Sequence, residues 1–257
     1  AVPSVLCRGK VGERVGRLKV DKWGDAIMNA TLKGPHMKTG HDMLKSTLNS
    51  LYKYSGLLSE VEPYGVFGDL IPQQPLNRVQ ARQARDPLTP DIRVDLPNGA
   101  GTMTRTYIEI KTCSGTSKWY ANPKERAVER RVEAIHKEYT KNAKEADTKY
   151  FGVEQGPISQ RLATMALTGM SFGMMGEAST SVHQTIQVMA EARVAQQNRA
   201  WGRGEEDEKA HMSAEVAYLR RRVSSANVIA FGQRLAGRMG QVGGQAAGQA
   251  TNRREHW

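Results

Sequence analysis

Apolar residues recur at helical spacing in two separate segments of the chain. Within residues 41–54 they lie four and three residues apart, at Leu44, Leu48 and Leu51. Within residues 123–149 the spacings are four, three and four, at Val128, Val132, Ile135 and Tyr139. Side chains at these spacings share one face of an α-helix. The pattern therefore predicts two amphipathic helices, and the second carries many Lys, Arg and Glu residues on its other faces.

Around and between these helices, short apolar and alternating runs are separated by turn signals, as is typical of β-strands. They predict, in order, a strand broken at Pro63, a proline-rich loop, the two arms of a hairpin and a last short strand, at residues 57–67, 68–90, 91–96, 104–113 and 150–153. The turn signal Pro97-Asn98-Gly99 joins the two hairpin arms. This order favours antiparallel pairing at the centre of the sheet.

Beyond residue 158 the helical spacing returns. The pattern predicts a helix over about residues 159–168 and two later helices, whose apolar positions are Val182, Ile186 and Met189 in one and Val216, Leu219 and Val223 in the other. The methionine-rich stretch at 165–175 predicts flexible packing within a core. Gly and Gln dominate after residue 237, which predicts a disordered tail.

These patterns divide the chain into four parts. Residues 1–36 are basic and glycine-rich, and we expect them to be irregular or to form short elements. Residues 37–157 are predicted to form an α+β core, in which a mixed central sheet is flanked by helices. Residues 158–236 are predicted to form a C-terminal helical appendage, and residues 237–257 the disordered tail.

Composition narrows the class of protein and of partner. The 257 residues include 37 Lys and Arg against 26 Asp and Glu, a formal net charge of +11 at pH 7. This composition excludes a collagen, a disulfide scaffold and a wholly disordered chain, and two cysteines, Cys7 and Cys113, favour a reducing intracellular compartment. The most apolar stretch, residues 165–176, is too short for a membrane span. The positive charge favours a polyanionic partner, most often nucleic acid.

The sharpest chemical feature lies on the predicted hairpin. Glu109 and Lys111 are two residues apart on one arm and therefore point to the same face, while Ile110 points to the opposite face. Pairing of the two arms can bring Asp91 alongside Glu109. Two carboxylates and the backbone carbonyl of Ile110 make a hard oxygen site suited to Mg²⁺ or Mn²⁺. Lys111 can then position a water molecule or stabilise charge on a phosphoryl group.

Pro90-Asp91 and Glu109-Ile110-Lys111 resemble the motif of the PD-(D/E)XK nuclease superfamily. The predicted order of elements over residues 37–157 also resembles its restriction-endonuclease-like core. The resemblance implies that Asp91 and Glu109 are metal ligands and that Lys111 is the catalytic lysine. It also implies that the basic helix at 123–149 packs on the sheet and faces the nucleic-acid backbone. The alternative is that Glu109 and Lys111 form a solvated strand face and Asp91 a turn or cap.

Five further residues are candidates for the same site or for its substrate. His41 and Glu62 are possible additional metal ligands, although a helix-end residue and an exposed strand residue are the ordinary alternatives. Lys137, Lys141 and Lys144 are candidate contacts to the nucleic-acid backbone, because phosphate contacts need only mobile positive charge. A solvated helix face is the alternative for these three lysines.

A second set of short motifs resembles the region downstream of the polymerase in some non-LTR retrotransposon open reading frames. The motifs include Leu32-Lys33-Gly34, Gly40-His41-Asp42, Gly156-Pro157 and the run from Gly173 to Ser179. The resemblance implies a mobile-element protein, active or decayed, with a nuclear location. Such regions often carry a zinc cluster, but this chain has Cys7, His36 and His41 without the paired cysteines that a tight zinc site needs. We therefore expect no zinc.

The sequence thus favours a Mg²⁺- or Mn²⁺-dependent endonuclease acting on nucleic acid, with DNA favoured over RNA. The first alternative is an inactive nucleic-acid-binding module on the same fold. The second is a helical interaction or structural protein whose positive charge only aids solubility. Metal-dependent cleavage and salt-dependent binding distinguish the three.

Overall fold

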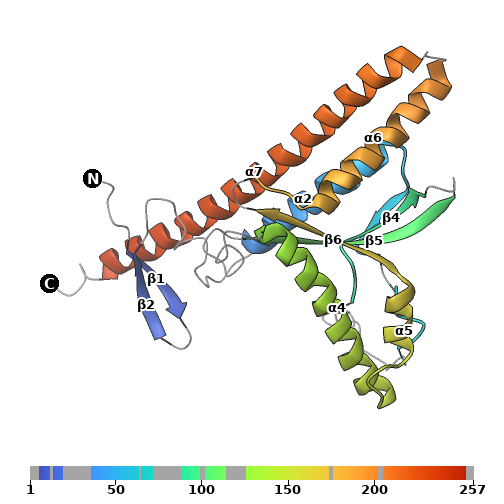
Figure 1. Ribbon diagram of the computed structural model, residues 1–257. Coiled ribbons are helices and arrows are strands. Elements are labelled where there is room, and N and C mark those ends of the chain that lie inside the picture. The colour runs from blue at the N-terminus through green and yellow to red at the C-terminus, as the bar shows by residue number, and fades with distance from the viewer. Residues whose placement is uncertain are drawn as a thin grey trace.

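The computed structural model describes residues 6–11, 14–19, 36–63, 65–71, 88–98, 102–113, 126–173, 176–201 and 205–252. Its elements follow the chain in the order β1 (Leu6–Val11), β2 (Arg14–Lys19), α2 (His36–Tyr54), β3 (Ser59–Val61), β4 (Ile92–Pro97), β5 (Met103–Cys113), α4 (Ala127–Phe151), α5 (Pro157–Thr164), β6 (Ala166–Gly173), α6 (Thr180–Trp201) and α7 (Glu205–Asn252). The fold is a mixed α/β arrangement around a central sheet (Figure 1).

The central sheet has four strands in the order β3-β4-β5-β6. β3 pairs with β4 and β4 with β5 in antiparallel fashion, whereas β6 runs parallel to β5. Ile92 faces Ile108 across the β4–β5 pair, so the predicted hairpin forms. The predicted strand at 57–67 is much shorter than expected, since only Ser59–Val61 pair with β4 and residues 65–70 form turns.

One face of the sheet is covered by α2, α6 and α7 (Figure 1). The buried stripe of α2 is the predicted one and joins a first core that includes Leu44, Leu48, Leu51, Ile92, Val94, Ile108, Ile110, Met170, Phe172, Val182, Ile186, Leu219 and Val223. Gly40 lets α2 approach α7 closely, because a Cβ there would lie 3.0 Å from the carbonyl oxygen of Ala230. The two long C-terminal helices therefore belong to the same core as the strands.

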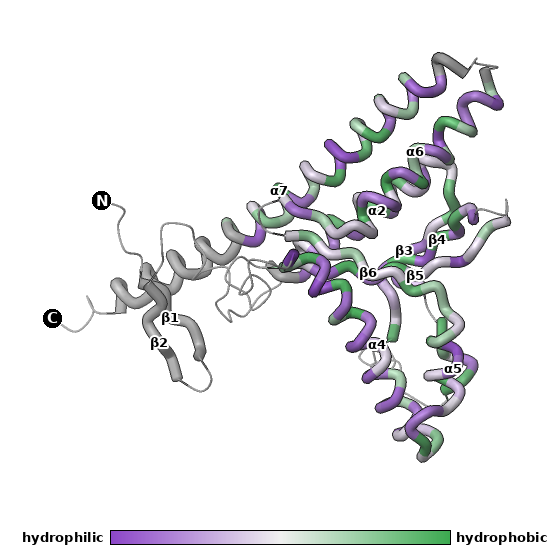
Figure 2. Tube along the Cα trace, viewed as in Figure 1, coloured by the Kyte–Doolittle hydropathy of each residue, from purple (hydrophilic) through white to green (hydrophobic). Residues whose placement is uncertain are grey.

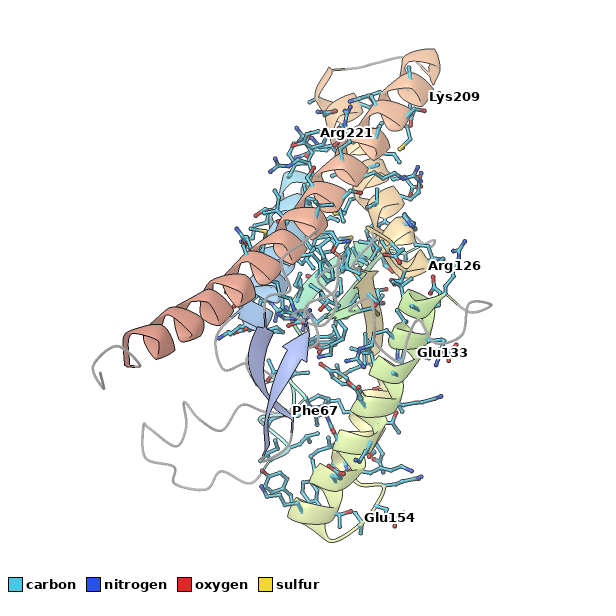
Figure 3. The ribbon with its side chains drawn as sticks, turned by 90° about the vertical axis from the view of Figure 1, so that its left-hand side faces the viewer. Phe67, Arg126, Glu133, Glu154, Lys209 and Arg221 are labelled. Carbon is cyan, nitrogen blue, oxygen red and sulfur yellow. The ribbon has the colours of Figure 1, made fainter. Side chains whose placement is uncertain are left out.

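The opposite face is covered by α4, and α5 packs against α4. The second core comprises Phe67, Leu88, Ile135, Tyr139, Ala143 and Ile158 (Figure 3). The predicted amphipathic helix is α4, and Figure 2 shows hydrophobic and hydrophilic residues alternating along it. Gly169 of β6 lies directly beneath this helix, since a Cβ there would be 3.1 Å from Cδ1 of Ile135. Residues 123–125 of the predicted helix lie outside the described residues.

A buried carboxylate joins α4 to α5. Asp147 is fully buried, and its two oxygens accept hydrogen bonds from the backbone N–H groups of Gly156, Ile158 and Ser159 at 2.9, 3.0 and 2.8 Å. These groups lie at the start of α5, where N–H groups have no partner within the helix. Asp147 therefore fixes the angle at which α5 leaves α4.

Three predictions in this half of the chain are wrong. The run at 150–153, predicted as a strand, is the end of α4, which stops at Gly152 with φ 71°. The helix predicted over 159–168 ends at Thr164, and the methionine-rich stretch that follows becomes β6. β6 lies beyond the expected domain boundary at 157/158 and is the fourth strand of the sheet. Met174 and Met175 lie outside the described residues.

The two ends of the chain are more regular than predicted. Within residues 1–36, expected to be irregular or to form short elements, β1 and β2 pair antiparallel from Leu6↔Lys19 to Val11↔Arg14. Only Gly12 and Glu13 separate these strands in sequence, and Gly-X is a two-residue hairpin signal. The expected disordered tail is helical through residue 252 as a continuation of α7, despite its glycines.

Two of the predicted features fall outside the part of the chain that the structure describes. Most of the predicted proline-rich loop, residues 72–87, lies outside the described residues, as do Leu32-Lys33-Gly34. No helix in the described part of the chain is long and apolar enough to cross a membrane.

Candidate metal and phosphodiester site

The pairing of β4 with β5 brings the motif residues together. Asp91 directly precedes β4, and its backbone N–H donates to the carbonyl of Ile108 at 2.9 Å. The register pairs Ile92 with Ile108, so the residues that flank this pair, Asp91 and Glu109, lie next to each other, and the charge of Asp91 acts on Glu109. Lys111 lies two residues further along the same face. The sequence prediction that an Asp, a Glu and a Lys meet on one face of the hairpin is therefore consistent with the observed register.

The carboxylate of Asp91 is almost buried, with 9% of the residue exposed. Its Oδ2 accepts a hydrogen bond from the backbone N–H of Ile110 at 2.7 Å. The same oxygen lies 3.1 Å from Nε2 of His41. Asp91 is thus held by a strand on one side and by a helix on the other.

Glu109 is equally buried, at 7% exposure, and each of its oxygens has a partner. Oε1 contacts the ammonium of Lys111, and Oε2 accepts a hydrogen bond from the hydroxyl of Tyr139 at 2.8 Å. Burial and the negative charge of Asp91 raise the pKa of Glu109, while Lys111 and Tyr139 act in the opposite direction. The site therefore holds two nearly buried carboxylates close enough for their charges to interact, with Lys111 as the cation in contact with Glu109.

His41 comes from α2. The helix begins at His36, so His41 lies inside it and the helix-end interpretation is wrong. Its ring contacts Asp91 and, through Nδ1 at 3.4 Å, Asp42. Burial acts to lower the pKa of His41, but the hydrogen bond and the charge of Asp91 outweigh it, so the pKa lies above its ordinary value. The contact with Asp91 therefore makes the charged form of His41 more favourable than in a free histidine.

Glu62 reaches the site through its backbone. Its N–H donates to the carbonyl of Asp91 at 2.8 Å, and its own φ of 48° lies in the left-handed region. Its carboxylate contacts Nζ of Lys45 at 2.6 Å, and that ammonium also lies 3.2 Å from Asp42. In this structure Glu62 therefore forms an ion pair beside the site rather than a third carboxylate within it.

The structure adds two residues that the sequence analysis missed. Lys45 lies one helical turn after His41, and only 6% of it is exposed. Tyr139 belongs to the apolar stripe of α4, and only 4% of it is exposed. A polar atom on a buried side chain needs a partner. A Tyr in an otherwise aliphatic stripe signals a buried hydroxyl that needs a partner, but it does not indicate that the partner is Glu109.

The three lysines predicted to bind a nucleic-acid backbone lie on the exposed face of α4. They line an open groove of about 770 Å³ together with His136, Thr140, Glu145, Thr148, Lys149 and Glu154. Lys141 lies 3.5 Å from Glu145, one turn away. The groove is on the outer side of the helix whose inner side carries Tyr139, so these lysines are not part of the site.

The donor set of the site fits a hard divalent cation. In a strand the N–H and C=O of one residue point to the same edge, so the carbonyl of Ile110 faces the edge at which its N–H meets Asp91. Two buried carboxylates and this carbonyl are the oxygen ligands that Mg²⁺ and Mn²⁺ prefer. In the described residues no three His, Cys, Asp or Glu side chains form a metal-binding group. The candidate site thus depends on two carboxylates and a backbone carbonyl.

Comparison of the sequence with protein-family models gave no match. Comparison with curated proteins gave no match either. The functional assignment therefore depends on the arrangement of Asp91, Glu109 and Lys111.

Proposed function

We propose that this protein is a metal-dependent nuclease that hydrolyses phosphodiester bonds of nucleic acid. The observation that carries the proposal is the placement of Asp91 next to Glu109, with Lys111 on the same face of β5. Buried carboxylates are costly unless they are paired or bind a cation. Their presence at the end of a strand pair, next to an amine, favours a catalytic site over a solvated strand face.

The topology supports the restriction-endonuclease-like form of this fold. The superfamily core is a helix, a three-stranded meander, a helix and a further strand. Here α2 is followed by the antiparallel strands β3, β4 and β5, then by α4, the short additional helix α5 and finally β6. A fold alone does not define a function, so this support adds to the site geometry and does not replace it.

Each residue of the site has a distinct proposed role. The carboxylates of Asp91 and Glu109 and the carbonyl of Ile110 would hold Mg²⁺ or Mn²⁺, which supplies a Lewis acid for the phosphate and for the attacking water. Lys111 is the most mobile of these groups, since 31% of its side chain is exposed. Its ammonium can turn from Glu109 towards the phosphate and stabilise the developing charge. His41 orients Asp91.

The proposed substrate is DNA. The net charge of +11 favours a polyanion, and Lys137, Lys141 and Lys144 offer exposed positive charge in a groove on the outer side of α4. Such contacts hold the backbone without reading its sequence. A mobile-element origin and a nuclear location remain predictions of the sequence.

A cleavage assay on supercoiled and linear DNA, with Mg²⁺, Mn²⁺ or a chelator, tests the proposal. The wild type should cleave only with metal, and Asp91→Ala and Lys111→Ala should each abolish cleavage. Lys209→Ala is the matched control, because Lys209 is an exposed lysine near the start of α7 (Figure 3). Equal cleavage by all four proteins would refute the assigned mechanism.

The same assay separates cleavage from binding alone. An inactive binding module would retain DNA in a gel-shift experiment, with an affinity that falls steeply with salt and does not change when metal is removed. That result, without cleavage under any metal condition, would replace the nuclease by the binding module.

A further inference from the structure

The hydroxyl of Tyr139 donates a hydrogen bond to Oε2 of Glu109 at 2.8 Å. Tyr139 belongs to α4 and is part of the second core. We infer that Tyr139 is a positioning residue that fixes the carboxylate of Glu109 and leaves its Oε1 as the oxygen that binds the divalent cation. The inference rests on the proposed function, because it concerns the same site.

The two partners of Glu109 differ in how freely they can move. Tyr139 is 4% exposed and lies between Ile135 and Ala143, which are both fully buried in the second core. Lys111 meets Oε1 with a flexible side chain that is 31% exposed. The bond to Oε2 is therefore set by the packing of α4, whereas the contact at Oε1 can be exchanged.

This difference selects one oxygen of Glu109. A carboxylate that already accepts a hydrogen bond loses little freedom when it binds a metal, and such outer partners commonly contribute to affinity. The ammonium of Lys111 occupies the place at Oε1 that a cation would take. A cation held by Oε1 would take the place of the Lys111 ammonium and leave Lys111 available for the substrate, while Tyr139 would keep the carboxylate in place.

The two partners should consequently affect metal binding in opposite directions. Tyr139→Phe removes one oxygen, retains the buried ring and should weaken the binding of Mn²⁺ by about ten- to a hundredfold. Lys111→Met removes the competing positive charge and should tighten Mn²⁺ binding several-fold, although cleavage is lost. A merely structural role of Tyr139 would give neither the weakening nor this contrast.

Isothermal titration of the full chain with Mn²⁺, without DNA, tests the inference. Tyr150→Phe is the matched control, because Tyr150 is a partly buried tyrosine of the same helix whose ring stacks with Lys149. Thermal unfolding without metal checks that Tyr139→Phe still folds. Equal Mn²⁺ affinity of the wild type, Tyr139→Phe and Tyr150→Phe would overturn the inference, as would weaker binding by Lys111→Met.

A second readout is the dependence of DNA cleavage on Mn²⁺ concentration. For Tyr139→Phe the half-saturating concentration should rise by a larger factor than the rate at saturation falls. If the wild type binds no Mn²⁺, the proposed function fails together with the inference. If the wild type binds Mn²⁺ and cleaves DNA, and Tyr139→Phe behaves identically, only the inference fails.

Discussion

The carboxylate of Asp91 accepts the backbone N–H of Ile110 at 2.7 Å, at the point where β4 begins. Elsewhere in a β-ladder such an N–H donates to a backbone carbonyl of the neighbouring strand. Here it donates to the side chain of Asp91 instead. Asp91 is therefore both part of the candidate site and part of the sheet, and its two roles can be separated by substitution.

Asp91→Ala should lower the free energy of unfolding by about 1–3 kcal/mol, because it leaves a buried N–H without its acceptor. Asp91→Asn keeps an oxygen at the same position and should unfold close to the wild type, although it lacks the charge needed to bind a cation. Urea denaturation of the three proteins without divalent metal checks this. Identical midpoints for the Ala and Asn variants would contradict the structural role.

Replacing Lys137, Lys141 and Lys144 together by Gln should weaken DNA binding and flatten its dependence on salt. Each lost phosphate contact reduces the slope of log affinity against log salt by about 0.9, so the slope should fall by up to about 3. Fluorescence anisotropy with a labelled duplex between about 50 and 200 mM salt measures it.

The matched control for this triple variant replaces the three exposed arginines of α7, Arg220, Arg221 and Arg222, by Gln. It removes the same charge from a different helix. A slope that falls equally in both triple variants would show that general charge, not the face of α4, determines binding.

Glu62→Gly should be more stable than Glu62→Ala by about 1 kcal/mol. Both variants lose the ion pair with Lys45, but the φ of 48° at this position costs an L-residue roughly 1–2 kcal/mol and glycine almost nothing. This reverses the usual order of the two residues in strands and helices. Chemical denaturation measures the difference, and a more stable Ala variant would contradict the backbone geometry.

Stability should depend on the ionisation of Asp147. Burial acts to raise the pKa of Asp147, but hydrogen bonds from Ser159, Ile158 and Gly156 outweigh it and hold the pKa below its ordinary value. A depressed folded-state pKa contributes stability that is present above the unfolded value, near 3.8, and is lost as the pH falls through the folded value.

Asp147→Asn should therefore be less stable than the wild type at neutral pH, and the difference should shrink as the pH falls below about 4. Denaturation midpoints over this range check it. Glu154→Gln, an exposed neighbour beyond the end of α4, should show no such trend (Figure 3). A difference between Asp147→Asn and the wild type that is constant with pH would exclude the ionic contribution.

The elements that build the site were predictable because their signals are local. Alternation over 91–96 and 104–113, with a turn signal between them, specifies a hairpin, and the register follows from which face is buried. The apolar stripes of α2 and α4 are likewise local patterns. Asp91, Glu109 and Lys111 could be placed together for this reason alone.

The predictions that failed concern elements whose structure depends on contacts between distant parts of the chain. The sequence of β6 contains small and polar residues, and its side chains are buried almost continuously rather than alternately. Its extended form comes from parallel pairing with β5, about 60 residues earlier in the chain. Conversely, Tyr150, Phe151 and Val153 look like a strand, but Gly152 ends a helix there and Phe151 and Val153 remain exposed.

The contacts of His41, Lys45 and Tyr139 were not predictable in detail for a related reason. Each comes from a helix, and the partner of each is set by how that helix lies across the sheet. A helical pattern reports which face is buried, but not which strand residue that face meets. Glu62 shows the same limit, since its carboxylate turns to Lys45 because of a backbone conformation that the sequence did not indicate.

The parallel pairing of β5 with β6 also bears on how fragments of this protein would behave. Glu109 and Lys111 sit on an interior strand only once residue 173 has joined the sheet. In a nascent or truncated chain that stops after α4, β5 would be an edge strand of eleven residues. Its unpaired backbone groups could then pair with any other extended peptide. Protection of the β5 edge therefore arrives only when β6 has been synthesised and has joined the sheet.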